Sequence, residues 1–193
     1  MKKLQELLSF KIDHSLETKI VSGIYDNSKH VMPESMFIAL NRNAANRKSH
    51  VNEAITCGAK YILQNGESGE NYCEIKDGIL FLFVKNVREE LAHVASRFFE
   101  SNFETVVAVT GTNGKSSTVD ILRQIWIRSG ISAASIGTLG VITQEKYEKL
   151  SNNMTLPDCI ELNRILHTLC GSGIKNVALE TTSQGIDQRR ADG

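Results

Sequence analysis

The first hundred residues alternate short apolar runs with polar stretches, which predicts a small domain of mixed helices and strands. Apolar runs predict strands at 20–25, 35–40, 61–63 and 79–84. Apolar residues at helical spacing predict helices at 3–8, 51–57 and 91–99, with Gly58 ending the second of them. Polar stretches predict loops at 41–49 and 65–72. We expect these elements to form one domain of residues 1–100.

The rest of the chain, from residue 101 to residue 193, follows a different order of strand, loop and helix. β-branched and apolar runs predict strands at 105–110, 132–141 and 177–179. Helical spacing predicts one helix that ends at Gly130 and another at 160–169 that stops at Gly171 or Gly173. Strands that alternate with helices are typical of a parallel sheet, so we expect an α/β fold.

Composition narrows the class of protein without identifying it. Of the 193 residues, 41% are apolar and 23% are charged, as in folded globular proteins. Lys and Arg number 22, as do Asp and Glu, so the zero net charge argues against general binding to nucleic acid or to a membrane. The start of the chain lacks a secretory apolar region, and no run has the length of a membrane span, so we expect a cytoplasmic protein.

The strongest signal for chemistry is TGTNGKSS at 110–117, which directly follows the apolar run at 106–109. A strand, a Gly-rich loop and a helix in this order form a phosphate-binding loop. Gly111 and Gly114 let the backbone turn sharply, so that N–H groups and the positive end of the helix dipole point at one place. An ordinary Gly-rich turn is the alternative, because Val109 stands where the common template has glycine.

The polar residues of the loop have expected partners in ATP. Lys115 would reach the outer phosphates as the catalytic cation, and Ser116 would place its hydroxyl on Mg²⁺. Donors to the nucleotide would come from the whole loop: Gly111, Thr112, Asn113, Gly114, Lys115, Ser116 and Ser117. The predicted cofactors are therefore ATP and Mg²⁺.

The amino-acid sequence of this loop resembles that of the corresponding loop in the Mur ligase and folylpolyglutamate synthetase superfamily. In that superfamily ATP phosphorylates a carboxylate, and an amine then attacks the acyl phosphate to form an amide. A folylpolyglutamate synthetase relative remains an alternative, although such proteins normally begin their ATP domain near the N-terminus. The leading domain at 1–100 favours the Mur ligases. The resemblance implies that this domain binds the UDP substrate, and that 101–193 is the first part of a parallel-sheet, phosphate-loop ATPase domain.

Three further segments resemble the Mur branch that adds the third peptide residue to UDP-N-acetylmuramoyl-L-alanyl-D-glutamate. YDNSKHVMPESMFIAL at 25–40 resembles an N-terminal signature whose serine, here Ser28, contacts the uridine part of the substrate. MTLP at 154–157 and ETTSQGIDQRR at 180–190 resemble two segments of the substrate cleft. They imply substrate contacts at Thr155, Leu156, Thr182, Gln188 and Arg190, where the fork of Arg suits a carboxylate or diphosphate.

Some of these positions have alternative interpretations or depart from the family pattern. Glu180 ends a predicted parallel strand beside the loop and is the expected second Mg²⁺ ligand, whereas the alternative is a solvated strand-end charge. Ser28 could belong to an ordinary Asn-Ser turn, and Thr155 to a polar segment before a helix capped by Asp158. Three residues depart from the family: Leu156 replaces a threonine, Thr182 a serine and Gln184 a histidine.

The resemblance implies an ATP-dependent ligase whose partners are a UDP-N-acetylmuramoyl dipeptide and a free amino acid, in a monomeric parent enzyme. Family members continue well past position 193, so the residues that choose between diaminopimelate and lysine would lie outside this chain. A sheet of three strands leaves unpaired donors and apolar faces, so we expect the chain to be poorly soluble by itself. The alternative of a different class is an inactive nucleotide-binding remnant.

Overall fold

The computed structural model describes residues 1–41, 43–144, 146–150 and 155–192. These residues form two compact units, Met1–Phe98 and Phe99–Asp192. Arg42 of the predicted loop at 41–49 lies outside the described residues, as does Met154 of the segment at 154–157. Within the described part of the chain, no helix has the length and the apolar character needed to cross a bilayer.

A five-stranded sheet forms the centre of the first unit. Its strands, in spatial order, are β3 (Ile24–Tyr25), β4 (Met36–Ile38), β5 (Tyr61–Asn65), β7 (Ile79–Val84) and β6 (Tyr72–Lys76). Neighbouring strands from β3 to β7 are parallel, whereas β6 pairs antiparallel with β7 at the edge. The strands predicted at 35–40, 61–63 and 79–84 are confirmed. The one at 20–25 divides into β3 and β2 (Ile20–Val21), which pairs with β1 (Lys2–Lys3).

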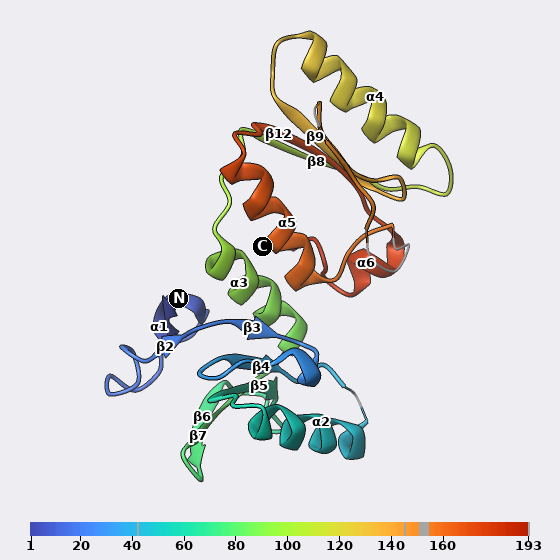
Figure 1. Cartoon of the computed structure of the whole chain (residues 1–193). Helices are drawn as coiled ribbons and strands as arrows, with labels where there is room; N and C mark the ends of the chain where they lie inside the picture. The colour runs from blue at the N-terminus through green and yellow to red at the C-terminus, as the bar shows by residue number, and fades with distance from the viewer. Residues whose placement is uncertain (42, 145, 151–154, 193) are drawn as a thin grey trace. The chain divides into compact units, whose positions relative to one another are not determined.

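Two helices of the first unit, α2 (Ala44–Thr56) and α3 (Val87–Phe99), cover opposite faces of this sheet (Figure 1). Two single turns, α1 (Leu4–Leu7) and the 3-10 helix η1 (Ser28–His30), lie outside it. Successive residues of a strand face opposite sides of a sheet. One face shares a core cluster with α2 that contains Phe37, Ile62, Val51 and Ala54. The strand residues that alternate with these are equally buried, so both faces hold a core: Met36, Ile38 and Leu63.

The first unit differs from the sequence-based expectation at two further places. Residues 41–49 do not form a loop, because α2 already begins at Ala44. The side chain of Asn43 caps this helix by accepting hydrogen bonds from the N–H groups of Ala45 and Asn46, at 3.0 and 3.2 Å. The strand β6 was missed because its side chains are mostly exposed. The signal that would have found it is the Asp77-Gly78 pair, which has φ values of 51° and 77° and turns the chain from β6 into β7.

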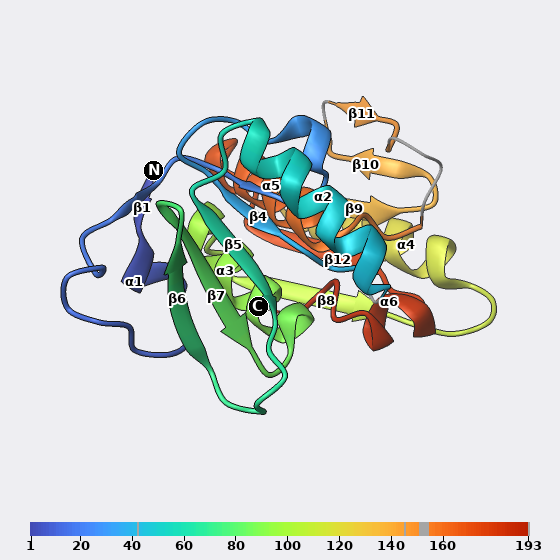
Figure 2. The same ribbon diagram turned by 90° about the horizontal axis from the view of Figure 1, so that it is seen from below.

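The second unit is built on another five-stranded sheet, with the order β11–β10–β9–β12–β8. Its strands are β8 (Thr105–Val109), β9 (Ala133–Gly137), β10 (Gly140–Ile142), β11 (Tyr147–Glu148) and β12 (Asn176–Glu180). Strand β12 lies between β8 and β9 and is parallel to both. Figure 2 shows β10 and β11 continuing the sheet beyond β9, and both of them pair antiparallel.

This antiparallel edge corrects two predictions. Residues 132–141 form the hairpin of β9 and β10 instead of one strand, and the sheet is mixed instead of wholly parallel. Thr138 and Leu139 make the turn, and Gly140 follows with a φ of 105°, which residues with a side chain rarely adopt. The α/β class itself is confirmed, because helices alternate with the parallel strands β8, β9 and β12.

Two helices, α4 (Lys115–Arg128) and α5 (Cys159–Gly171), cover opposite faces of the second sheet (Figure 1). The short helix α6 (Ser183–Asp187) follows β12. The core on the α5 side includes Ala134, Ile136, Leu162, Leu169, Val177 and Leu179. Gly130 and Gly173 both have a φ of 79° just after α4 and α5, which confirms the predicted helix ends.

Candidate phosphate-loop site

The predicted phosphate loop joins β8 to α4 in the second unit. Strand β8 ends at Val109 and α4 begins at Lys115. Gly111 and Gly114 have φ values of 145° and 81°, which glycine adopts more readily than other residues. A Cβ atom on Gly114 would meet nothing within 4 Å, and one on Gly111 would meet only the carbonyl oxygen of Asn113, at 3.7 Å. The space in front of the loop is therefore open to a ligand.

The polar groups of the loop lie where phosphate oxygens can reach them. Lys115 folds back over the loop, and its ammonium donates a 2.7 Å hydrogen bond to the carbonyl oxygen of Gly111. Gly114 is the N-cap of α4 and has no side chain that could cap the first turn. The other polar residues of the loop are exposed or half-buried: Thr112, Asn113, Ser116 and Ser117. An anion would therefore find an ammonium group and the start of a helix at one place.

Glu180 ends β12 and lies beside Val109, the residue that precedes the loop, because β12 pairs with β8 in that register. The residue is only 1% exposed, so the interpretation as a solvated strand-end charge is wrong. Its carboxylate lies over Gly137, where an added Cβ atom would collide with Oε1. Position 137 must therefore lack a side chain for Glu180 to keep this orientation.

Thr138, in the turn between β9 and β10, holds the carboxylate of Glu180. Its N–H group donates to Oε1 at 2.9 Å, and its hydroxyl donates to Oε2 at 3.3 Å. The same hydroxyl lies 3.0 Å from the hydroxyl of Thr155, a predicted substrate contact. Sequence reasoning missed Thr138 because it placed the residue inside one continuous strand. The nearby Gly137 and Gly140 were the available signal for a turn.

Three of the predicted substrate contacts meet at the C-terminal end of the chain. The guanidinium of Arg190 donates to Oε1 of Gln188 at 2.9 and 2.7 Å, and to the carbonyl oxygen of Leu156 at 3.0 Å. The side chain of Leu156 is 2% exposed and lies against Gly185. The side chain of Leu156 therefore contributes to the core, while its backbone oxygen orients Arg190.

The remaining predicted contacts have local partners. Thr182 is the N-cap of α6, and its hydroxyl accepts a 3.0 Å hydrogen bond from the N–H of Gly185. Ser28 lies in the first unit, is 5% exposed, and donates a 2.5 Å hydrogen bond to Glu53. Its segment forms the single turn η1, so the turn interpretation is correct for the local structure. Asp158 caps α5 by accepting from the N–H of Glu161 at 2.9 Å, which confirms its predicted role as a cap.

The oxygen ligands predicted for Mg²⁺ come from the first turn of α4, at Ser116, and from the end of β12, at Glu180. Mg²⁺ commonly takes one or two protein oxygens and fills its other positions with phosphate and water. Among the described residues, three or more His, Cys, Asp and Glu side chains nowhere gather into a metal site. Within the residues that the structure describes, the Glu180 carboxylate accepts hydrogen bonds from Thr138 and forms no ion pair with Lys or Arg. This donor set fits a nucleotide-bound Mg²⁺.

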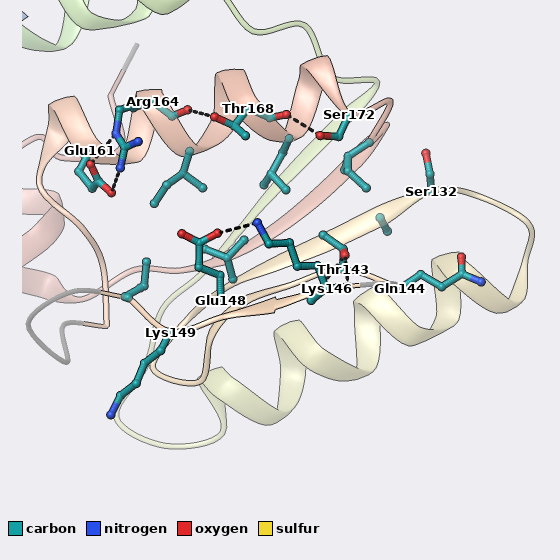
Figure 3. A pocket seen from close by; sticks show the side chains of 16 residues that line it. Ser132, Thr143, Gln144, Lys146, Glu148, Lys149, Glu161, Arg164, Thr168 and Ser172 are labelled. Atoms are coloured by element: carbon teal, nitrogen blue, oxygen red, sulfur yellow. Dashed lines mark hydrogen bonds and ion pairs between the residues drawn. The ribbon is translucent and has the colours of Figure 1, made fainter.

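A separate cavity of 510 Å³ lies between α5 and the strands β10 and β11 (Figure 3). Glu161 and Arg164 form an ion pair on the α5 side at 2.6 Å, and Lys146 and Glu148 form one on the strand side at 3.3 Å. The hydrogen bond from Arg164 to Glu161 is the main cause that raises the pKa of Arg164. Among the described residues that line this cavity, none is a predicted site residue. The cavity is therefore distinct from the phosphate loop.

Similar proteins align with nearly the whole chain. Residues 109–193 match the Mur ligase middle domain. A UDP-N-acetylmuramoyl-L-alanyl-D-glutamate--2,6-diaminopimelate ligase of Rhizobium meliloti (strain 1021) is 35% identical over 187 residues, which are 96% of this chain and 37% of that protein. The ligase of the same name from Agrobacterium fabrum is 37% identical over 193 residues, which are 99% of this chain and 36% of that protein. The chain thus spans little more than a third of the length of these relatives.

Solved structures have the same fold. A structure of a UDP-N-acetylmuramoyl-L-alanyl-D-glutamate--2,6-diaminopimelate ligase matches with a TM-score of 0.82 at 22% identity, over 100% of this chain and 38% of that chain. The structure of a MurF ligase from Thermotoga maritima in complex with ADP matches with a TM-score of 0.51 at 19% identity, over 83% and 32% of the two chains. At these identities the likeness establishes the fold alone.

Proposed function

We propose that this chain, whose residues 109–193 match the Mur ligase middle domain, is part of an ATP-dependent ligase of peptidoglycan precursor synthesis. The substrate would be UDP-N-acetylmuramoyl-L-alanyl-D-glutamate, and 2,6-diaminopimelate would be the amino acid added, as the names of the relatives suggest. The observation that carries the proposal is the open loop with the Lys115 ammonium folded over it, one strand away from the buried Glu180. We place the reaction in the cytoplasm, where ATP is available.

In the proposed reaction, the γ-phosphoryl group of ATP moves to a carboxylate of the substrate and ADP is released. The amine of the amino acid then attacks the acyl carbon, expels phosphate and loses a proton, which leaves an amide. Lys115 would exchange its bond to the Gly111 carbonyl for bonds to phosphate oxygens and so offset their charge. Bound Mg²⁺ would supply further charge neutralisation, and Ser116 and Glu180 would hold it.

Arg190 supports the proposed site for the UDP substrate. Three hydrogen bonds, to Gln188 and to the Leu156 carbonyl, fix its guanidinium before any ligand is present. A guanidinium held in this way loses little side-chain entropy when it binds a carboxylate or a phosphate. We propose that the hydroxyls of Thr155 and Thr182 add further contacts to this substrate in the second unit, and that Ser28 adds one in the first.

Calorimetry on the purified chain tests the proposal with two ligands, ADP with Mg²⁺ and UDP-N-acetylmuramoyl-L-alanyl-D-glutamate. Both should bind. Arg190→Ala should weaken binding of the UDP substrate by about 30-fold and leave ADP binding unchanged, because a charge-assisted hydrogen bond contributes about 2 kcal/mol. Arg128→Ala, at the exposed end of α4, is the matched control and should change neither affinity.

The outcomes separate the possible functions. If the wild-type chain binds neither ligand, the proposed function is rejected. If it binds both ligands without turning over ATP in the presence of the amino acid, it is a nucleotide-binding remnant and not by itself an enzyme. Amide formation coupled to ADP release would establish the ligase reaction in this chain.

A further inference from the structure

Glu180, Thr138 and Thr155 form a row of hydrogen-bonding side chains that comes from three separate segments of the second unit. Oε2 of Glu180 accepts from the Thr138 hydroxyl at 3.3 Å, and that hydroxyl lies 3.0 Å from the Thr155 hydroxyl. A shorter bond of 2.9 Å, from the Thr138 N–H to Oε1, fixes the other carboxylate oxygen. The row therefore connects the proposed metal ligand to the proposed substrate segment.

A threonine hydroxyl carries one proton, so Thr138 can donate to Glu180 or to Thr155 but not to both. An ionised carboxylate is the stronger acceptor of the two. While Glu180 has no counter-ion, Thr138 donates to Glu180, and Thr155 must then donate its own proton to Thr138. In this state the proton of Thr155 is engaged within the protein.

We propose that Thr138 is a positioning residue that couples cation binding at Glu180 to the hydrogen-bonding state of Thr155, an inference that rests on the proposed function. Oε2 has the longer of the two hydrogen bonds and is the oxygen that a cation can take. When it does, the proton of Thr138 turns toward Thr155. The proton of Thr155 is then released to an acceptor on the UDP substrate.

This coupling predicts that each ligand raises the affinity for the other, by a modest factor. Binding of the metal and nucleotide raises the affinity for the UDP substrate, and by linkage the substrate raises the affinity for the metal and nucleotide by the same factor. Thr138 is exposed and Thr155 is half-buried, so water competes for both hydroxyls. We therefore expect a factor of about five, near the lower end of measured couplings between sites.

Glu180→Gln imitates the cation-bound state without a cation. The amide oxygen still accepts from the Thr138 N–H, while the amide nitrogen donates to the Thr138 hydroxyl oxygen, so the Thr138 proton must turn to Thr155. This variant should bind the UDP substrate about fivefold more tightly than wild type in the absence of Mg²⁺. Loss of the Glu180 charge also favours an anionic substrate, so the coupling further requires that most of this gain disappear when Thr138→Val is added.

Nuclear magnetic resonance of the Thr155 side chain tests the coupling without any ligand. Its carbon-13 resonances should differ between wild type and Glu180→Gln. The difference should disappear when Thr138→Val is added, because valine keeps the shape and lacks the hydroxyl, and it should persist with Thr138→Ser. A Thr155 resonance that does not respond to Glu180→Gln, or that still responds in the Thr138→Val background, overturns the proposal.

Titration of Mg²⁺ and ADP into wild type and Thr138→Val repeats this test if the Glu180→Gln variant does not fold. Thr155 should respond in wild type only, and an equal response in both proteins overturns the coupling. Calorimetry with the UDP substrate tests the final step. If Thr155 responds while the substrate affinity of Glu180→Gln equals that of wild type, release of the Thr155 proton to substrate is disproved. If wild type binds no UDP substrate, the proposed function fails, and the Thr155 resonance still decides the coupling.

Discussion

The strands β8 and β12 are parallel neighbours that end side by side, yet they are fixed to different degrees. All five residues of β12 are buried, whereas three residues of β8 are exposed and two are half-buried. In the described part of the chain, β12 pairs with a strand on each side and β8 is the edge strand. The strand that carries Glu180 is therefore stabilised by a neighbouring strand on each side and by burial of both of its faces. The strand that leads into the predicted phosphate loop pairs with one strand only and is largely exposed.

The two helices that cover this sheet also differ in how many of their residues are buried. Helix α4, which starts at the loop, fully buries only Val119, whereas α5 buries Cys159, Leu162, Asn163 and Leu169. Ile121 and Ile125 of α4 are 55% and 53% exposed. We therefore expect the loop end of the site to open at a lower free energy than the packed end, and ligand binding should stabilise it. The poor solubility expected from the sequence stays a prediction, and these exposed apolar side chains are its most direct cause.

The largest expected effect comes from matched substitutions at Val177 of β12 and Val106 of β8, which are partners in the sheet. Val177 is 0% exposed and Val106 is 51% exposed. Val177→Ala removes two buried methyl groups and leaves a cavity, so the free energy of unfolding should fall by about 2–3 kcal/mol. Val106→Ala should lower it by about 0.5 kcal/mol or less. Urea unfolding followed by the fluorescence of Trp126, the single tryptophan, measures both, and equal losses would contradict the comparison.

A smaller effect is expected at the loop itself, on binding instead of folding. Lys115→Ala removes the ammonium that lies over the loop, so the affinity for ADP with Mg²⁺ should fall by about 30-fold, or about 2 kcal/mol. The free energy of unfolding should change little, because α4 buries so few residues. Lys175→Ala, which breaks only the exposed ion pair with Glu104, is the control and should leave the ADP affinity unchanged. Calorimetry on both variants decides whether the loop binds phosphate through this lysine.

The packed side of the site can be disturbed through Gly137. In Gly137→Ala the new Cβ atom collides with Oε1 of Glu180, so the carboxylate must leave its position. The gain in ADP affinity that Mg²⁺ provides should fall by about fivefold, or about 1 kcal/mol. Gly171→Ala, in α5, is the control because its Cβ atom would meet nothing within 4 Å. If both variants keep the full Mg²⁺ effect on ADP affinity, Glu180 is not a ligand of the nucleotide-bound metal.

The smallest expected effect concerns the pH dependence of α4. Asp120 accepts hydrogen bonds from Arg123 at 2.6 Å and from Gln124 at 2.7 Å, and the bond from Arg123 is the main cause that lowers the pKa of Asp120. Because its pKa is lower in the folded than in the unfolded chain, this carboxylate stabilises the fold above about pH 4, and the stabilisation is lost as the pH falls through the folded pKa. Asp120→Asn should lower the free energy of unfolding by about 0.5 kcal/mol at pH 7.

Urea unfolding of wild type and Asp120→Asn at pH 7 and at pH 2 measures this contribution. The difference between the two proteins should be present at pH 7 and should shrink as the pH falls and Asp120 takes up a proton. A difference that is as large at pH 2 as at pH 7 would show that the contribution of Asp120 does not come from its charge.

Features that depend on consecutive residues were predicted correctly from the sequence. The strands β5, β7 and β12, the helix ends at Gly130 and Gly173, and the cap at Asp158 all follow from local patterns. The antiparallel pairing of β9 with β10 was not predicted, because the direction of a strand depends on its neighbours in the sheet. The early start of α2 was missed because its first residues are polar, although Asn43 is a typical N-cap.

The sequence by itself determined the conformation of the predicted phosphate loop, since two glycines, a lysine and a helix start within eight consecutive residues need no distant partner to take their shape. Only the tertiary structure decided the environment of Glu180 and Arg190. Thr138 lies 42 positions before Glu180, and Leu156 lies 34 positions before Arg190. These pairs meet because β12 pairs with β9 in the sheet and Gly185 of α6 packs against the side chain of Leu156. The amino-acid sequence shows which side chains can donate or accept hydrogen bonds. Which partners they bond to depends on the tertiary packing that brings them together.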